Sequence, residues 1–162
     1  MTHLLLHSFK KILSEKKMKF ALIILINLIN THFSFGQSDV YEHSLEIISP
    51  GAYTLYWNYT NTNLTAEIVV KTLGWVSFGI TKKGQLDGSD LFLAWITTTK
   101  TYFIDSHFES GSIVTDVRQN WQLLNSFESN GYTTIKFTRK IILSGDDAAQ
   151  DIDIETGTPY IR

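Results

Sequence analysis

Apolar and polar residues alternate with a period of two along most of the chain after residue 37. Between residues 53 and 59 every second side chain is aromatic or aliphatic, which is typical of a strand with one buried face. Similar runs predict strands over 66–71, 75–80, 91–96, 101–105, 121–124 and 132–138, and a short last strand through Ile152 and Ile154. Ser129-Asn130-Gly131 predicts a hairpin turn. Short strands at this spacing predict an all-β fold, an antiparallel sandwich or barrel.

The first 36 residues have the layout of a secretory signal peptide. Three lysines (Lys16, Lys17 and Lys19) precede the apolar run 20–29, and the small residues Ser34 and Gly36 follow it. The run is shorter than the ~20 apolar residues of an ordinary membrane span. We therefore predict a signal peptide over 1–36, with a start at Met1 or Met18, and a folded domain over 37–162. The mature protein is expected in the secretory-pathway lumen or outside the cell, with no stable membrane span after cleavage.

Composition and charge narrow the possible functions. The chain has 162 residues, 14 Lys+Arg, 16 Asp+Glu and no cysteine, which excludes a disulfide framework, a cysteine nucleophile and a cysteine zinc site. Without residues 1–36, which hold five Lys and one Glu, 9 basic and 15 acidic groups remain, a net charge of −6. A nucleic-acid partner is therefore not expected. The sequons at Asn58 and Asn63 predict glycosylation, and no Gly-x-Ser-x-Gly elbow or other catalytic set is found.

Several motifs follow one another in a recognisable order. They are Leu55–Asn58, Gly74–Ile80, Lys83–Leu91, Asp105, Asp116, Trp121–Leu124, Thr134–Lys140 and Asp151–Ile154. This series resembles the DOMON domain at the N-terminus of dopamine β-monooxygenase and its monooxygenase-like relatives, over about residues 38–162. The resemblance implies an immunoglobulin-like β-sandwich. In the copper monooxygenases this domain precedes two catalytic domains that bind copper.

Copper chemistry is not expected from this chain alone. After residue 36 it has only His43 and His107 and no methionine, so a copper site built on His and Met side chains cannot be assembled. We expect a secreted, non-catalytic module for ligand, cation or protein interaction. The alternative is the N-terminal part of a copper-dependent hydroxylase, with downstream catalytic domains as partners. Relatives have a Cys-Asp pair where this chain reads Leu143-Ser144-Gly145-Asp146-Asp147, and the absence of the cysteine fits a stand-alone or altered domain. The alternative stays open because the relatives continue into another strand beyond residues 158–162.

Asp90 and Asp105 are the candidate metal ligands, with Asp87 as an auxiliary one. Asp90 opens an apolar strand and Asp105 closes the next predicted strand. Carboxylates at strand ends can hold a hard cation such as calcium through oxygen atoms. Monooxygenase DOMON domains are similar in presenting such acidic residues to a metal site. The competing interpretation is that these side chains cap turns by accepting backbone N–H groups.

Haem and sugar binding are two further alternatives. Some DOMON domains are b-type cytochromes with Met and His axial ligands, but here Leu86 stands in the Met position, which leaves only His107 or His43 as a ligand. Exposed aromatic side chains could stack on sugars, and Tyr56 is the best candidate because it opposes the apolar parity of its strand. Trp75, Trp95 and Trp121 are expected in the core instead.

Overall fold

The computed structural model describes residues 39–82, 84–145, 150–155 and 160–161. The described residues all belong to one compact unit. The predicted signal peptide therefore lies outside the described residues.

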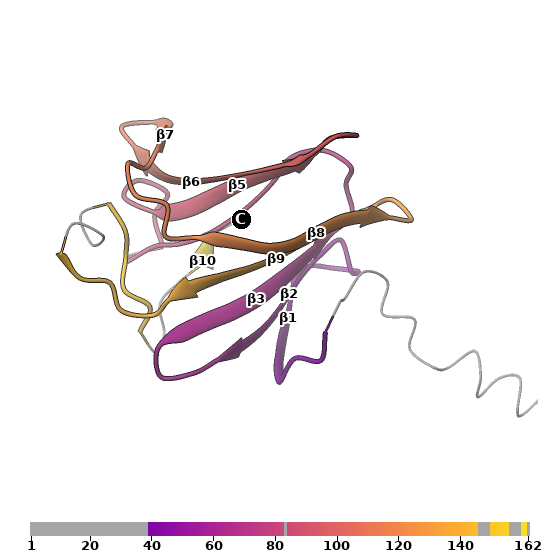
Figure 1. Ribbon diagram of the computed structural model, residues 1–162, viewed down its shortest axis with the longest axis horizontal. Coiled ribbons are helices and arrows are strands. Elements are labelled where there is room, and N and C mark those ends of the chain that lie inside the picture. The colour runs from indigo at the N-terminus through magenta and orange to yellow at the C-terminus, as the bar shows by residue number, and fades with distance from the viewer. Residues whose placement is uncertain (1–38, 83, 146–149, 156–159, 162) are drawn as a thin grey trace, which may run out of the picture. The chain divides into compact units, whose positions relative to one another are not determined.

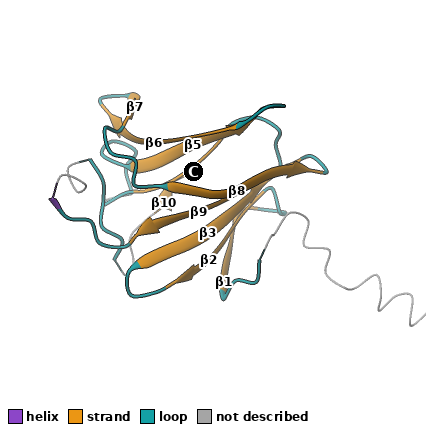
Figure 2. Ribbon diagram, in the orientation of Figure 1, coloured by secondary structure: helices purple, strands orange, loops and turns teal. Residues whose placement is uncertain are grey.

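The described unit is built from two antiparallel five-stranded sheets that face each other (Figure 1). The first sheet has the order β1-β2-β3-β9-β8, and the second has the order β10-β4-β5-β6-β7. Loops join the strands at the two ends of the sandwich (Figure 2). The bounds are β1 His43–Ile48, β2 Tyr53–Tyr59, β3 Asn63–Val70, β4 Val76–Ile80, β5 Asp90–Ile96, β6 Thr101–Glu109, β7 Ser112–Thr115, β8 Gln122–Ser129, β9 Tyr132–Lys140 and β10 Tyr160–Ile161.

This architecture confirms the predicted all-β, antiparallel immunoglobulin-like sandwich. The strand at 53–59 has the predicted bounds, and Asn130 and Gly131 take the positive φ angles of a tight hairpin turn. The strand expected through Ile152 and Ile154 was wrong, because residues 150–155 are irregular. The N–H of Ile152 bonds to the Asp90 carboxylate and its carbonyl accepts from Arg139. These side chains take the place of a neighbouring strand.

Aromatic rings from both sheets fill the space between them. Phe78 and Phe92 come from one sheet and Phe137 comes from the other. Trp121 is the residue just before β8. All four are 3% exposed or less, and their ring centroids lie 4.7–6.3 Å apart. Burial of such rings is the main stabilising contribution in a small domain without disulfides.

Two of the tryptophans expected in the core lie elsewhere. Trp121 is buried as predicted, but Trp75 is 68% exposed and Trp95 is only half-buried. Trp95 stacks on Tyr102, with centroids 4.5 Å apart. Both tryptophans line an apolar hollow of about 510 Å³. The alternation fails as a guide here because this sheet is also apolar on the face turned away from the other sheet.

Gly79 brings β4 and β5 unusually close at the start of β5. It pairs with Leu91, and a Cβ at this position would lie 2.5 Å from the Asp90 carbonyl oxygen and 2.5 Å from the Leu91 Cβ. It would also lie 2.8 Å from the Leu91 Cα. The Asp90 carbonyl oxygen and the Leu91 Cα are backbone atoms, which cannot move aside without shifting the strand. Glycine at residue 79 therefore helps to fix the position of Asp90.

We expect Gly79→Ala to destabilise the protein by about 1–3 kcal/mol, the usual cost of overpacking. Gly74→Ala is the matched control, because its nearest atom would be the Thr72 hydroxyl at 3.4 Å. Thermal unfolding of both variants checks this expectation. Equal melting temperatures for the two variants would contradict it.

Candidate metal centre

Asp90 lies at the base of a buried polar cluster. In the strand register Asp90 pairs with His107. Phe92, two residues further along β5, pairs with Asp105. The side chains of Asp90, Asp105 and His107 therefore leave this sheet on one face and point toward the other sheet. The Asp90 carboxylate is fully buried and both of its oxygens have partners. One oxygen accepts the indole N–H of Trp121, and the other accepts the Ile152 N–H at 3.0 Å and lies 2.7 Å from an Arg139 nitrogen.

Asp105 is also fully buried, but only one of its oxygens has a donor. The backbone N–H groups of Asn120 and Trp121 both donate to Oδ2, the latter at 3.0 Å. This half of the side chain caps the turn that leads into β8, as the capping interpretation expected. No donor among the described residues reaches Oδ1, which is shielded from solvent.

Asp151 completes the cluster from a segment distant in sequence. It is 9% exposed, and its Oδ2 accepts the Asn120 side-chain N–H at 2.7 Å. Its Oδ1 is buried and has no donor among the described residues. Ile152, the next residue, is bonded to both Asp90 and Arg139. The segment 150–155 is therefore held against the end of the sandwich by the charged groups it covers.

One carboxylate oxygen from each of Asp90, Asp105 and Asp151 lies within 4.8 Å of the other two. Three acidic groups this close repel one another when they are ionised, and burial strengthens the repulsion. Oxygens without protein donors in such a place are satisfied by protons, by a buried water or by a cation. The arrangement is therefore a candidate site for a metal ion bound by oxygen atoms.

The carboxyl pKa values reflect this crowding. Burial raises the pKa of Asp105 to about 8, although the N–H groups of Trp121 and Asn120 oppose the shift. Burial also raises the pKa of Asp151 to about 7, and the neighbouring Asp90 adds to this effect. The pKa of Asp90 is raised by burial in the same direction, against the opposing effect of Arg139. Without a cation, the cluster is therefore expected to hold protons near neutral pH.

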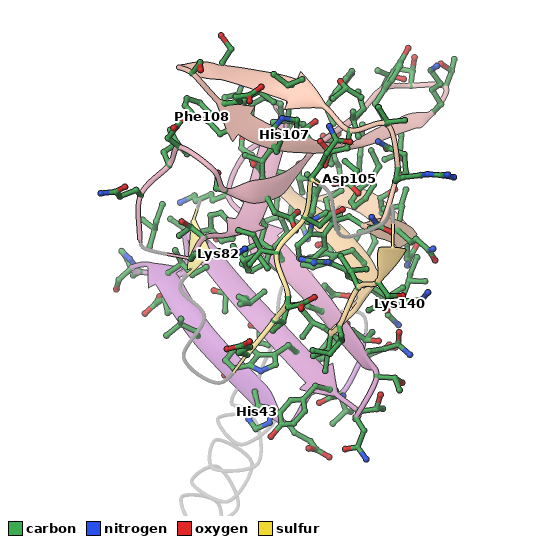
Figure 3. The ribbon with its side chains drawn as sticks, turned by 90° about the vertical axis from the view of Figure 1, so that its left-hand side faces the viewer. His43, Lys82, Asp105, His107, Phe108 and Lys140 are labelled. Atoms are coloured by element: carbon green, nitrogen blue, oxygen red, sulfur yellow. The ribbon has the colours of Figure 1, made fainter. Side chains whose placement is uncertain are left out.

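His107 and Asp116 form a second pair next to the cluster. Nδ1 of His107 bonds to Asp116, and the side chain of His107 is 15% exposed, so it is more enclosed than a surface residue. The hydrogen bond with Asp116 raises the pKa of His107. Burial raises the pKa of Asp116, whereas its bond to His107 lowers it. Figure 3 shows Asp105 and His107 at the same end of the molecule.

The structure brings together two of the three acidic residues singled out from the sequence. Asp90 and Asp105 share the cluster, whereas Asp87 is exposed and its Oδ1 accepts the Ser110 N–H at 2.8 Å, outside that cluster. Asp151 was not among the ligands expected from the sequence, and the structure adds it to the cluster. Arg139 was also missed, although it shares the inward parity of Ile135 and Phe137 in its strand.

The other residues named from the sequence lie away from the cluster. His43 stacks on Trp57 and Tyr59, and Figure 3 shows it at the opposite end of the view from His107. Leu86 is 47% exposed. The amide of Asn58 bonds to the backbone at Val40 and Glu42, whereas Asn63 is exposed. Glycosylation of either asparagine stays a prediction.

Comparison with known protein families identifies the family of this chain. The family model of the DOMON domain matches residues 49–161, which include the three clustered carboxylates. The chain belongs to the DOMON domain family. This family had been expected from the motif order, so the resemblance is confirmed.

The relatives of this DOMON domain are much longer proteins. The chain is 30% identical over 122 residues to MOXD1 homolog 2 of Drosophila melanogaster, covering 74% of this chain and 16% of that protein. It is 25% identical over 122 residues to human DBH-like monooxygenase protein 1, covering 74% of this chain and 20% of the relative. It is 30% identical over 115 residues to human dopamine beta-hydroxylase, covering 68% of this chain and 18% of that protein. The chain thus spans a fifth or less of each of these three relatives.

One solved structure resembles the DOMON domain more loosely. It is the cytochrome domain of Myriococcum thermophilum cellobiose dehydrogenase, with a TM-score of 0.47, 17% identity, and coverage of 68% of this chain and 60% of that one.

Within the part of the chain that the structure describes, no helix has the length and apolar character needed to cross a bilayer.

The raised pKa values predict how stability depends on pH when no metal is present. Asp105 and Asp151 bind protons more tightly in the folded state than in the unfolded chain, where the reference pKa is 3.8. The free energy of unfolding should therefore fall as pH rises from about 4 toward 8. The raised pKa of His107 acts in the same direction above pH 6.5. Thermal melts at a series of pH values in chelator-containing buffer measure this slope.

The variant Asp105→Asn identifies the group responsible. Because an amide mimics the protonated carboxyl, this variant should melt higher than the natural protein at pH 8 in chelator, and its pH slope should be shallower. A lower melting temperature for the variant at pH 8, with an unchanged slope, would contradict the assignment.

Proposed function

We propose that this DOMON domain is a non-catalytic binding module of the secretory pathway that holds one structural divalent cation through Asp90, Asp105 and Asp151. The observation that carries the proposal is the pair of buried oxygens, Oδ1 of Asp105 and Oδ1 of Asp151, that lack donors. Both belong to carboxylates whose oxygen atoms cluster within 4.8 Å. A cation between these oxygens would satisfy them and remove the repulsion.

The donor set supports a hard cation of the calcium class. All three groups offer oxygen atoms, which suit calcium or magnesium better than zinc or copper. The three ionised carboxylates carry −3 and the buried guanidinium of Arg139 carries +1, so a divalent ion neutralises the cluster. Calcium takes six to eight oxygen ligands, so backbone carbonyls or water would complete its shell around the three carboxylates.

The burial of the cluster supports a structural role for the ion. Asp90 and Asp105 are both 0% exposed, so a substrate has no direct access to them. The ion would instead tie β5 and β6 to the segment 150–155. The secretory location is supported by the signal-like N-terminal segment and suits calcium, which is abundant outside the cytosol.

Calcium should raise the melting temperature of the domain at pH 7.5 relative to chelator. At a concentration 100 times the dissociation constant, a ligand that binds only the folded state adds about 2.7 kcal/mol. For a domain of this size that corresponds to a shift of several degrees. The shift should be lost in Asp105→Asn and Asp151→Asn.

Asp87→Asn is the matched control, since Asp87 is an exposed carboxylate outside the cluster. Its calcium shift should equal that of the natural protein. If calcium and magnesium leave the melting temperature of the natural protein unchanged, or if Asp87→Asn loses the shift as fully as Asp151→Asn, the cation proposal fails.

A second candidate function is that of an accessory domain in a longer copper-dependent hydroxylase. It is supported by the relatives, which are named as monooxygenases or hydroxylases and of which this chain matches a fifth or less. Other domains of the same polypeptide would then be its partners and would supply the copper. Sequencing the transcript through the codon for Arg162 tests this: a continued frame with His-x-His and Met-containing motifs supports it, and a stop codon contradicts it.

Haem and sugar binding have weaker support than the cation. Leu86 has no donor atom for iron, and Nδ1 of His107 is engaged by Asp116. Tyr56, the candidate sugar platform, is half-buried and packs beside Tyr41 with centroids 6.0 Å apart. An absorption spectrum of the purified protein tests haem directly, because bound haem gives a Soret band.

A further inference from the structure

Asp116 lies directly across from Asp105, one residue beyond the end of β7. The β6–β7 ladder includes the pair Ser106 and Thr115. One residue further, the Asp116 N–H donates to the Asp105 carbonyl at 3.0 Å, so the two aspartates continue the register. Side chains at directly opposite positions lie on the same face of a sheet, with Cβ atoms about 4.5–5.5 Å apart. The carboxylate of Asp116 therefore faces the same interior space as that of Asp105.

One oxygen of Asp116 is fixed, and the other has no donor. Oδ1 bonds to Nδ1 of His107, which lies two residues along β6 from Asp105 and points to the same face. The amide of Gln119 ties the carbonyls of Asp105 and Asp116 together, donating to them at 3.1 and 3.0 Å. The Asp116 side chain is 0% exposed, and no donor among the described residues reaches Oδ2. Oδ2 is therefore a buried acceptor, held in place, that needs a donor.

Asp116 acts electrostatically on the carboxylate cluster, although it lies outside the set of closest oxygens. Burial is the main reason that the pKa values of Asp90 and Asp151 are raised, and the negative charge of Asp116 adds to both shifts. The oxygens that all lie within 4.8 Å of one another come from Asp90, Asp105 and Asp151, and not from Asp116. Calcium binds oxygen at about 2.3–2.6 Å, so ligands on opposite sides of one ion are at most about 5 Å apart. The geometry thus places Asp116 beside the direct ligands rather than among them.

A water molecule bound to the cation would suit this position. Calcium takes six to eight oxygen ligands, so three carboxylates leave room for water beside the ion. A water held by a cation directs its hydrogen atoms away from the ion, toward an acceptor such as a buried carboxylate oxygen. Carboxylates that reach a calcium ion through water are a regular part of calcium sites.

We propose that Asp116 is a positioning residue of the cation site, whose Oδ2 accepts a hydrogen bond from a water molecule bound to the ion. His107 holds the Asp116 carboxylate in place for this role and acts on the ion only through it. This inference rests on the proposed cation function and adds a fourth acidic residue to that site. It accounts for the Asp116 oxygen, which a cation on the other three carboxylates would leave without a partner.

Terbium(III) is the probe for the bound water, because it occupies calcium sites and luminesces when a nearby indole absorbs light. Trp121, whose indole N–H bonds to Asp90, is placed to sensitise it. Luminescence lifetimes in H₂O and D₂O count the water molecules on the ion. We expect at least one on the natural protein. A count of zero would overturn the proposal without the need for any variant.

Asp116→Ala should weaken calcium binding, measured by displacement of terbium, by about 10–100-fold, the usual effect of losing a group that supports a metal ligand. The number of bound waters should stay the same, because no direct ligand is removed. His107→Ala should weaken binding in the same direction, and His107→Gln, which keeps a side-chain N–H, should recover part of the loss. One additional bound water in Asp116→Ala would identify Asp116 as a direct ligand and overturn the positioning role.

Glu109→Ala is the matched control. Glu109 also faces His107, 3.8 Å from its Nε2, but its side chain is 70% exposed and it lies outside the cluster. Its calcium affinity should equal that of the natural protein, and cooperative melting in chelator shows that each variant folds. If the natural protein binds neither calcium nor terbium, the cation function itself fails. If it binds both, but Asp116→Ala binds calcium as tightly as Glu109→Ala, only the role of Asp116 is wrong.

Discussion

The ion pair between Asp90 and Arg139 is the interaction on which the rest of the polar end of the sandwich depends. Both side chains are buried, one from each sheet, and their closest atoms lie 2.7 Å apart. Burying a charge is costly unless it is paired and hydrogen-bonded. Trp121 and Ile152 provide these hydrogen bonds, so the start of β8 and the segment 150–155 are both organised around the pair. Removing either partner would leave an uncompensated charge between the sheets.

The same constraint explains why Asp105 and Asp151 are close to the ion pair. Once the turn before β8 is held by Trp121, its N–H groups cap one oxygen of Asp105, and Asn120 reaches Asp151. Each of these two carboxyls keeps one oxygen without a donor. The excess of acidic groups over the single arginine creates the requirement for protons or a cation. The capping and the metal-binding interpretations of Asp105 therefore apply to its two different oxygens.

Sequence patterns predicted the parts of the structure that depend on local contacts. Alternation gave the sandwich and the strand at 53–59, because a half-buried strand imposes a period of two on its own residues. The burial of Asp151 depends on Asp90 and Asn120, which are 61 and 31 residues away, and no local pattern reports such contacts. Arg139 was detectable in principle, since it continues the inward series of Ile135 and Phe137. Trp75 was assigned to the core because alternation does not tell which face of a two-sided apolar strand is covered.

A crystal structure of the domain grown with calcium tests directly whether the three carboxylates hold a cation. We expect one strong density peak within coordination distance of carboxylate oxygens from Asp90, Asp105 and Asp151, with the segment 150–155 ordered over it. Density that shows direct carboxyl–carboxyl hydrogen bonds at pH 7.5 in saturating calcium, with no peak between the three side chains, would contradict it.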